Sequence, residues 1–225
     1  MDGGDAVLTV AQTHVQHGTT TLLATTMTAP GDDLRIAFAG VAAARAAARG
    51  TALAHIHGVH LEGPFIAAGK LGAQPDFTRP ISLAEVSSLH AIAPIALITV
   101  APEADAAGGR IAALVEAGFR VQLGHSGASY EAAKAALDAG ACGFTHLYNA
   151  MSALHHRQPG MVGAALAHAS HAEIIPDLLH VHPGAIRVAL RSIAGLYCVT
   201  DSTAAAGMPD GEYRLGRQIV TRCMG

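Results

Sequence analysis

His14–Leu23 reads HVQHGTTTLL: the end of a polar helical pattern, a glycine, and then a β-branched and apolar run. Such a run, following directly on a helical pattern, predicts a buried strand. Units of this kind recur along the chain, where apolar strands alternate with alanine-rich segments of helical periodicity. The alternation predicts a parallel sheet covered by helices, either closed as a (β/α)8 barrel or open and doubly wound.

Seven segments are expected to be strands and six to be helices. The expected strands are Thr20–Thr26, Leu53–Leu61, Ile95–Ala101, Arg120–Gly124, Cys142–His146, Glu173–Pro176 and Leu196–Thr200. The expected helices are Ala6–His17, Asp33–Arg49, Leu83–Ala91, Ala106–Ala117, Ser129–Ala139 and Pro183–Ile193. No GxGxxG follows the first strand, which favours the barrel over the open form.

The two ends of the chain suggest an incomplete barrel. Seven strands are one fewer than a (β/α)8 barrel needs, and the chain opens on a helix. The last stretch, GEYRLGRQIVTRCMG, alternates like a hairpin and then stops. We therefore expect residues 1–225 to form a single, partial barrel domain cut from a larger one.

Composition excludes several classes of function. The chain is 51% hydrophobic and has a formal net charge of −3 with histidine neutral, so it carries no electrostatic footprint for nucleic acid or anionic membranes. No apolar run reaches the ~20 residues that span a bilayer. The start, MDGGDAV, does not resemble a signal peptide, and the three cysteines lack CxxC spacing. We expect a cytoplasmic protein that binds neither nucleic acid nor membranes.

Polar residues collect where the expected strands end, which is where parallel barrels place their chemistry. The groups there that bind metals or transfer protons are Glu62, His125, His146, His180 and Asp201. They lie 21 or more residues apart, so they are not a local metal loop and can meet only if the barrel brings the strand ends together. One such residue is ordinarily structural, but five around one sheet indicate a metal site.

A glutamate and two histidines form a common catalytic zinc set, which leaves one position open for water. Such a metal lowers the pKa of water toward ~7 and polarises a substrate carbonyl. Asp201, if it is not a ligand, is a candidate general base and acid. The sequence GHSGAS around Ser126 does not match GxSxG, so a serine hydrolase is not favoured.

The motifs HLEGPF, LGHS, THLYNAM, the RxPG of Arg157–Gly160, LHV and VTD occur in this order. Together they resemble the N-acetylglucosamine-6-phosphate deacetylase family of the amidohydrolase superfamily, from about Thr20 to Gly216. The resemblance implies a metal-dependent (β/α)8 barrel, here without its first strand and without the small β-sandwich that the family builds from both chain ends. It implies hydrolysis of N-acetyl-D-glucosamine 6-phosphate to D-glucosamine 6-phosphate and acetate, in amino-sugar catabolism.

The family's functional residues carry over motif by motif. The resemblance implies that Glu62, His125 and His146 bind a divalent metal, with zinc as the expected ion, and that Asp201 is the catalytic base and acid. The substrate-binding residues that it implies are Ala73, Gln74, Asn149, Ala150, Arg157, Asp177, Leu178, Leu179 and His180. It also implies a small-molecule substrate and a homo-oligomer when the protein is full length.

The chain departs from the family pattern at two of these positions. Gln74 stands where many members have a histidine thought to polarise the amide carbonyl; an amide N–H can still donate, but it carries no charge. Leu178 stands where the family usually has glycine, which would crowd the sugar. Without the first strand, a second metal cannot be argued. Two alternatives stay open: a non-catalytic fragment that at most binds metal or sugar phosphate, and an amidohydrolase for another N-acyl sugar.

Overall fold

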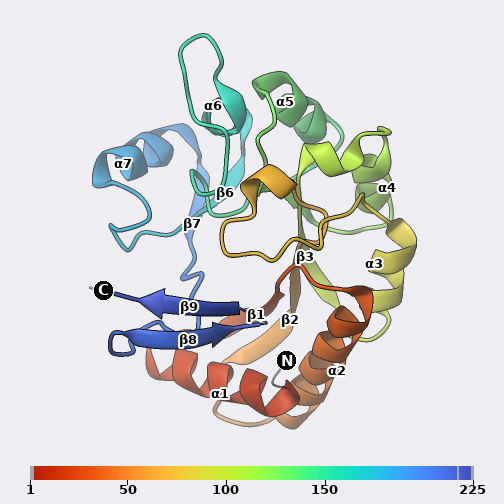
Figure 1. Cartoon of the computed structure of the whole chain (residues 1–225), viewed down its shortest axis with the longest axis vertical. Helices are drawn as coiled ribbons and strands as arrows, with labels where there is room; N and C mark the ends of the chain where they lie inside the picture. The colour runs from red at the N-terminus through yellow and green to blue at the C-terminus, as the bar shows by residue number, and fades with distance from the viewer. Residues whose placement is uncertain (1–2, 217, 224–225) are drawn as a thin grey trace.

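The structure, a computed structural model, describes residues 3–216 and 218–223. Seven parallel strands form one sheet in simple chain order. They are β1 (Thr21–Thr26), β2 (His55–Glu62), β3 (Ile95–Val100), β4 (Val121–Leu123), β5 (Gly143–Phe144), β6 (His171–Ile174) and β7 (Gly195–Cys198). The sheet curls into part of a barrel with helices around its outside (Figure 1). The predicted incomplete (β/α)8 architecture is confirmed.

Seven α-helices and two short 3-10 helices accompany the strands of the described chain: the first precedes β1, and the others lie between strands. They are α1 (Gly3–Gln16), α2 (Gly31–Ala47), η1 (Ala68–Lys70), α3 (Leu83–His90), η2 (Pro102–Asp105), α4 (Arg110–Glu116), α5 (Tyr130–Asp138), α6 (Gly160–His168) and α7 (Pro183–Ser192). The six predicted helices are all present, within a few residues at most ends. None of the helices described is long and apolar enough to cross a bilayer.

Helix α6 was not predicted. Its opening sequence, GMVG, follows a proline, and glycine and proline together are loop signals. Packing overrides that preference, because every residue from Gly160 to Ala165 is buried. A Cβ on Gly163 would lie 2.3 Å from Pro159 Cβ, so the glycine permits the close contact that seats the helix.

Several predicted boundaries differ from the structure by two to four residues, and two of these differences have a local cause. Helix α4 begins at Arg110 rather than Ala106, because Gly108 and Gly109 have left-handed φ angles of 74° and 84°. The carboxylate of Asp105 then accepts hydrogen bonds from the first backbone N–H groups of the helix. Strand β6 ends at Ile174 rather than Pro176, at the last residue that pairs with β7.

The predicted C-terminal hairpin is present as β8 (Gly211–Leu215) and β9 (Gln218–Arg222), an antiparallel pair separate from the main sheet. Three residues of the predicted stretch, Arg217, Met224 and Gly225, lie outside the described residues. In the view of Figure 1 the hairpin appears below β7 and to the left of β1. A Cβ on Gly216 would lie 3.8 Å from Met27 Sδ, so the turn approaches the end of β1.

Candidate metal centre

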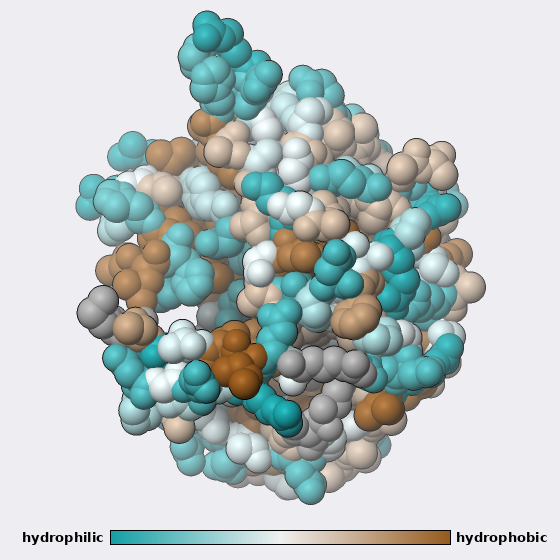
Figure 2. All heavy atoms as spheres, in the orientation of Figure 1, coloured by the Kyte–Doolittle hydropathy of each residue, from teal (hydrophilic) through white to brown (hydrophobic). Residues whose placement is uncertain are grey.

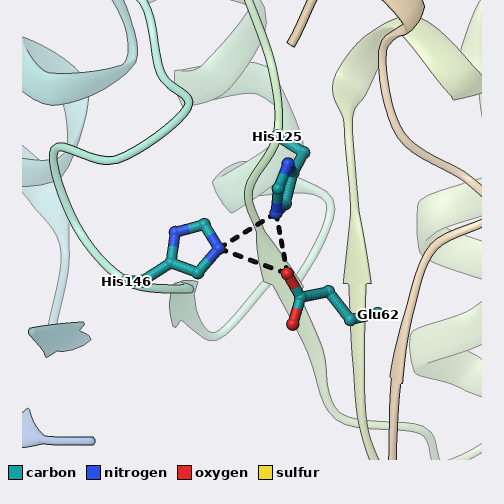
Figure 3. Close-up of side chains that lie close together, drawn as sticks. All are labelled: Glu62, His125 and His146. Carbon is teal, nitrogen blue, oxygen red and sulfur yellow. Dashed lines mark hydrogen bonds and ion pairs between the residues drawn. The ribbon is translucent and has the colours of Figure 1, made fainter. Parts of the chain in front are cut away.

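Three side chains from different strand ends meet inside the curled sheet (Figure 3). Glu62 ends β2, and His125 and His146 each follow a strand by two residues, β4 and β5 respectively. Glu62 Oε1 lies 2.7 Å from His125 Nε2 and 3.2 Å from His146 Nε2, and the two Nε2 atoms are 3.0 Å apart. All three residues are buried. Across residues 3–216 and 218–223, only this group of metal-ligating side chains converges so closely.

The backbone turns sharply where these residues stand. His125 and His146 have φ angles of 47° and 31°, in the left-handed region that side chains other than glycine rarely adopt. Gly63, just after Glu62, has a φ of 76°, and a Cβ there would lie only 2.0 Å from Thr28 Oγ1. Only glycine therefore fits beside Thr28. Such unfavourable backbone conformations cluster at functional sites, where they aim side chains.

The hydrogen bonding of His125 suits a metal ligand. Its Nδ1 lies 2.8 Å from the backbone oxygen of Lys70, which can only accept, so Nδ1 carries the proton. In the neutral ring, Nε2 then directs a lone pair at Glu62 Oε1. Two lone pairs at 2.7 Å require a cation between or beside them, either a proton or a metal. A backbone carbonyl on the second ring nitrogen is the usual way in which proteins orient a metal-binding histidine.

The charges of the cluster depend on one another. Burial alone would raise the pKa of Glu62, but hydrogen bonds from His125 and His146 hold it well below its usual value. Burial alone would lower the pKa of His146, but the hydrogen bond and charge of Glu62, with the charge of Asp201, raise it to about 9. Without a metal, the cluster therefore holds a proton at neutral pH, and a divalent cation would displace it.

This coupling predicts how His146 contributes to the stability of the metal-free protein. Its folded pKa of about 9 exceeds its ordinary 6.5, so its contribution is complete below pH 6.5 and is lost as the pH rises through about 9. We expect the difference in Tm between the wild type and His146→Gln to be largest near pH 6 and to shrink toward pH 10. Thermal unfolding in the presence of a chelator measures this difference, and a difference independent of pH would contradict the prediction.

Gln74 lies beside the cluster and is buried. Its Oε1 accepts a hydrogen bond of 2.7 Å from the backbone N–H of Thr28, which fixes the orientation of the amide. Its Nε2 therefore faces Glu62 and donates to Oε1 at 3.3 Å. The sequence placed Gln74 at the substrate, but this contact with a candidate metal ligand was not predicted. Thr28 is 46 residues away in the chain, and no local pattern indicates that the two meet.

Some of the other predicted site residues lie next to the metal ligands. Asp201 follows β7 in a left-handed turn with a φ of 47°, is exposed, and is close enough for its charge to raise the pKa of His146. Asn149 Nδ2 donates to the backbone oxygen of His146 at 3.2 Å. Ala150 follows Asn149 with a φ of 52°, and Ala73 is the exposed neighbour of Gln74.

The remaining predicted residues occupy exposed loops. Arg157 is exposed, within the segment between β5 and α6 that projects from the body of the molecule (Figure 1). Figure 2 shows that this projection is hydrophilic. Asp177 Oδ2 pairs with His180 Nδ1 at 2.6 Å, while Leu178 and Leu179 are 61% and 74% exposed. Among the described contacts, none joins these residues to the Glu62, His125 and His146 cluster by a hydrogen bond or an ion pair.

Ser126, the serine of GHSGAS, is fully buried. Its hydroxyl donates to Glu103 Oε2 at 2.6 Å and accepts from the backbone N–H of Ala128. The side chain therefore stabilises the loop after β4 and is not exposed as a nucleophile, in agreement with the sequence prediction.

The chain resembles proteins of known function along nearly all of its length. No protein-family model matches it. The N-acetylglucosamine-6-phosphate deacetylase of Vibrio furnissii is 42% identical over 221 residues, which are 96% of this chain and 55% of that protein. The N-acetylgalactosamine-6-phosphate deacetylase of Escherichia coli O157:H7 is 37% identical over 219 residues, 95% of this chain and 58% of that protein.

A solved structure also matches the fold. It is a variant of the N-acetyl-D-glucosamine-6-phosphate deacetylase of Mycobacterium smegmatis in complex with N-acetyl-D-glucosamine 6-phosphate. The TM-score is 0.81 at 36% sequence identity, covering 93% of this chain and 56% of that one. The chain thus spans somewhat more than half the length of the relatives that it matches.

Proposed function

Because the chain is related in sequence and fold to the N-acetylglucosamine-6-phosphate deacetylases, we propose that it hydrolyses N-acetyl-D-glucosamine 6-phosphate to D-glucosamine 6-phosphate and acetate. The observation that carries the proposal is the convergence of Glu62, His125 and His146 at the carboxyl ends of three strands. The M. smegmatis relative binds this sugar phosphate. The reaction would belong to amino-sugar catabolism.

The donor set fits a divalent metal, and we propose zinc. One carboxylate and two imidazoles are a common ligand set of catalytic zinc, with an open position for water or substrate. Glu62, His125 and His146 would hold the ion through Oε1 and the two Nε2 atoms that already converge. When bound, the metal would polarise the acetamide carbonyl and lower the pKa of water.

The chain's own residues would manage the proton and the sugar. Asp201 would take a proton from the attacking water and return it to the amine as the carbon–nitrogen bond breaks and acetate leaves. Asn149, Ala150, Ala73 and the 177–180 segment would contact the sugar. Arg157 would bind its phosphate, since the planar guanidinium matches two phosphate oxygens at once.

A second substrate is favoured by one observation. The E. coli relative acts, by its name, on N-acetylgalactosamine 6-phosphate. This sugar differs from N-acetylglucosamine 6-phosphate only in the configuration at C4, far from the acetamide. The same metal centre would serve both sugars, and selection between them would fall to the residues that contact the ring.

The proposal is tested by incubating the zinc-loaded protein with three sugars: N-acetylglucosamine 6-phosphate, its galactosamine epimer and unphosphorylated N-acetylglucosamine. Released acetate and free amine are measured. We expect turnover of the glucosamine phosphate, with a lower kcat/KM when the phosphate is absent. Zinc binding without release of acetate from any of the sugars would support the non-catalytic alternative. Faster hydrolysis of the epimer would reassign the substrate.

The cytoplasmic location and the homo-oligomer implied by the resemblance stay predictions. The second applies to the full-length protein, and light scattering of that protein tests it. A monomer at micromolar concentration would contradict it.

Gln74→Ala is expected to lower kcat by about 10²- to 10³-fold, the range for losing one donor to a developing oxyanion. Its Nε2 donates to Glu62 Oε1, and we propose that the same N–H₂ group also donates to the substrate carbonyl. Zinc content is measured in the same samples. A lower kcat with full zinc supports donation to the carbonyl, whereas parallel loss of zinc would show that Gln74 acts only by supporting Glu62. An unchanged kcat would mean that the metal alone polarises the carbonyl.

A further inference from the structure

A chain of hydrogen-bonded polar side chains crosses the curled sheet, and all of its members are buried except Tyr197, which is 39% exposed. Each member comes from a different strand or strand end, from β2 to β7. Its contacts are His60 Nε2 to Thr99 Oγ1 (2.7 Å), Thr99 Oγ1 to Thr145 Oγ1 (2.7 Å), Thr145 Oγ1 to Gln122 Oε1 (3.1 Å), Gln122 Nε2 to Tyr197 Oη (2.7 Å) and Tyr197 Oη to Glu173 Oε1 (3.0 Å). The proposed reaction uses none of these side chains.

The donors and acceptors of this polar chain have one fixed direction. Gln122 Oε1 can only accept, so the single hydroxyl proton of Thr145 is donated to it. Thr145 Oγ1 must then accept from the hydroxyl of Thr99. Thr99 therefore accepts from His60 Nε2, which carries a proton. On the other side, the Gln122 amide donates to Tyr197, whose hydroxyl donates to Glu173. The polar chain thus terminates on the carboxylate of Glu173.

The second oxygen of Glu173 holds a metal ligand. Glu173 Oε2 accepts from the backbone N–H of His146 at 3.3 Å, and the side chain is buried. This contact matters for His146 because the second nitrogen of its ring has no partner in the described structure, unlike that of His125. His125 is oriented by Lys70 through Nδ1, whereas His146 Nδ1 is buried and has no hydrogen-bond partner among the described residues. Apart from the contacts of its Nε2 with Glu62 and His125, the His146 side chain has no hydrogen bond among the described residues, so its direction also depends on its left-handed backbone turn, with a φ of 31°.

We propose that Glu173 is a positioning residue for the metal centre: it holds the backbone turn that aims His146 at Glu62, and the polar chain through Tyr197 and Gln122 holds Glu173. The role is specific to a carboxylate. Both of its oxygens face donors, Tyr197 Oη–H and His146 N–H. A glutamine of the same shape has one acceptor oxygen, so it would turn an N–H₂ group toward one of these donors.

The test compares Glu173→Gln, Tyr197→Phe and Ile174→Val with the wild type. Ile174 is the buried neighbour of Glu173 on β6 and its side chain points to the other face of the sheet, so Ile174→Val costs stability without touching the polar chain. Zinc affinity is measured by competition with a chelator. We expect Glu173→Gln to weaken it by about 10- to 100-fold, as for other partners of metal ligands, and Tyr197→Phe to weaken it less. Ile174→Val should keep the wild-type affinity.

A second measurement needs no metal. The amide resonance of His146, recorded by ¹H–¹⁵N NMR in the metal-free protein, should shift upfield in Glu173→Gln and stay in place in Ile174→Val. The inference rests on the proposed metal centre, but the two can fail separately. A wild type that binds no zinc overturns the metal centre, while the His146 resonance still tests the hydrogen bond from the His146 backbone N–H to Glu173. Wild-type zinc affinity in Glu173→Gln, or equal losses of affinity in Glu173→Gln and Ile174→Val, overturns the positioning role.

Discussion

Replacing His125 or His146 with alanine is expected to reduce zinc affinity by about 100- to 1000-fold. Structural zinc sites bind with roughly 10–16 kcal/mol over four ligands, so each ligand contributes on the order of 3 kcal/mol. No other side chain can replace the lost ligand, because Glu62, His125 and His146 form the one cluster of metal-ligating groups in the described structure. Elemental analysis after dialysis should find stoichiometric zinc in the wild type and little in either variant.

The matched control is His57→Ala. His57 lies on the same strand as Glu62, but its side chain is exposed and is not part of the cluster. His57→Ala therefore removes a histidine without removing a candidate ligand. It should keep full zinc content. A second readout is thermal: zinc should raise the Tm of the wild type and of His57→Ala, because a ligand that binds only the folded state stabilises it. Stoichiometric zinc in both His125→Ala and His146→Ala would refute the metal centre.

The strands and the candidate metal centre could be predicted because each has a recognisable pattern in the local sequence. Apolar runs between helical patterns indicated all seven strands of the sheet. The rule that chemistry lies at the carboxyl ends of parallel strands selected five residues, of which Glu62, His125 and His146 converge, whereas His180 lies in an exposed loop. Helix α6 has no such pattern. Its glycines resemble a loop, and it is helical because its glycine-rich face packs closely, which only the tertiary structure shows.

The contacts around the metal centre were beyond prediction for a different reason. Glu173, Tyr197 and Gln122 lie in apolar strands, where a polar residue gives no sign of whether it faces the interior or the helices. Their side-chain partners are 23 to 75 residues away in the chain, so no spacing indicates the pairs. The same holds for the backbone of Lys70, which orients His125 from 55 residues away.

Asp201→Asn is expected to lower kcat by 10²-fold or more while zinc content stays at the wild-type level. Asparagine keeps the shape of the side chain but cannot accept the proton, and general acid–base catalysis contributes about 10²–10⁴-fold. The change is also mild for the backbone. Asp201 has a φ of 47°, and asparagine is among the residues that best tolerate this left-handed conformation. A loss of activity would therefore not be explained by strain at the turn.

Two roles of Asp201 are separated by measuring zinc and turnover in the same sample. As the proton carrier, Asp201 leaves the three ligands in place, so zinc is retained and only turnover falls. If Asp201 is instead a fourth ligand, Asp201→Asn would lower the zinc content as well as the turnover. A third measurement reports its position directly: the charge of Asp201 helps to raise the pKa of His146, so Asp201→Asn should lower that pKa in the metal-free protein. Asp138→Asn, the same chemical change on the exposed surface of α5, should alter none of the three. Normal turnover in Asp201→Asn would exclude Asp201 as the proton carrier, because asparagine cannot accept the proton that the reaction transfers.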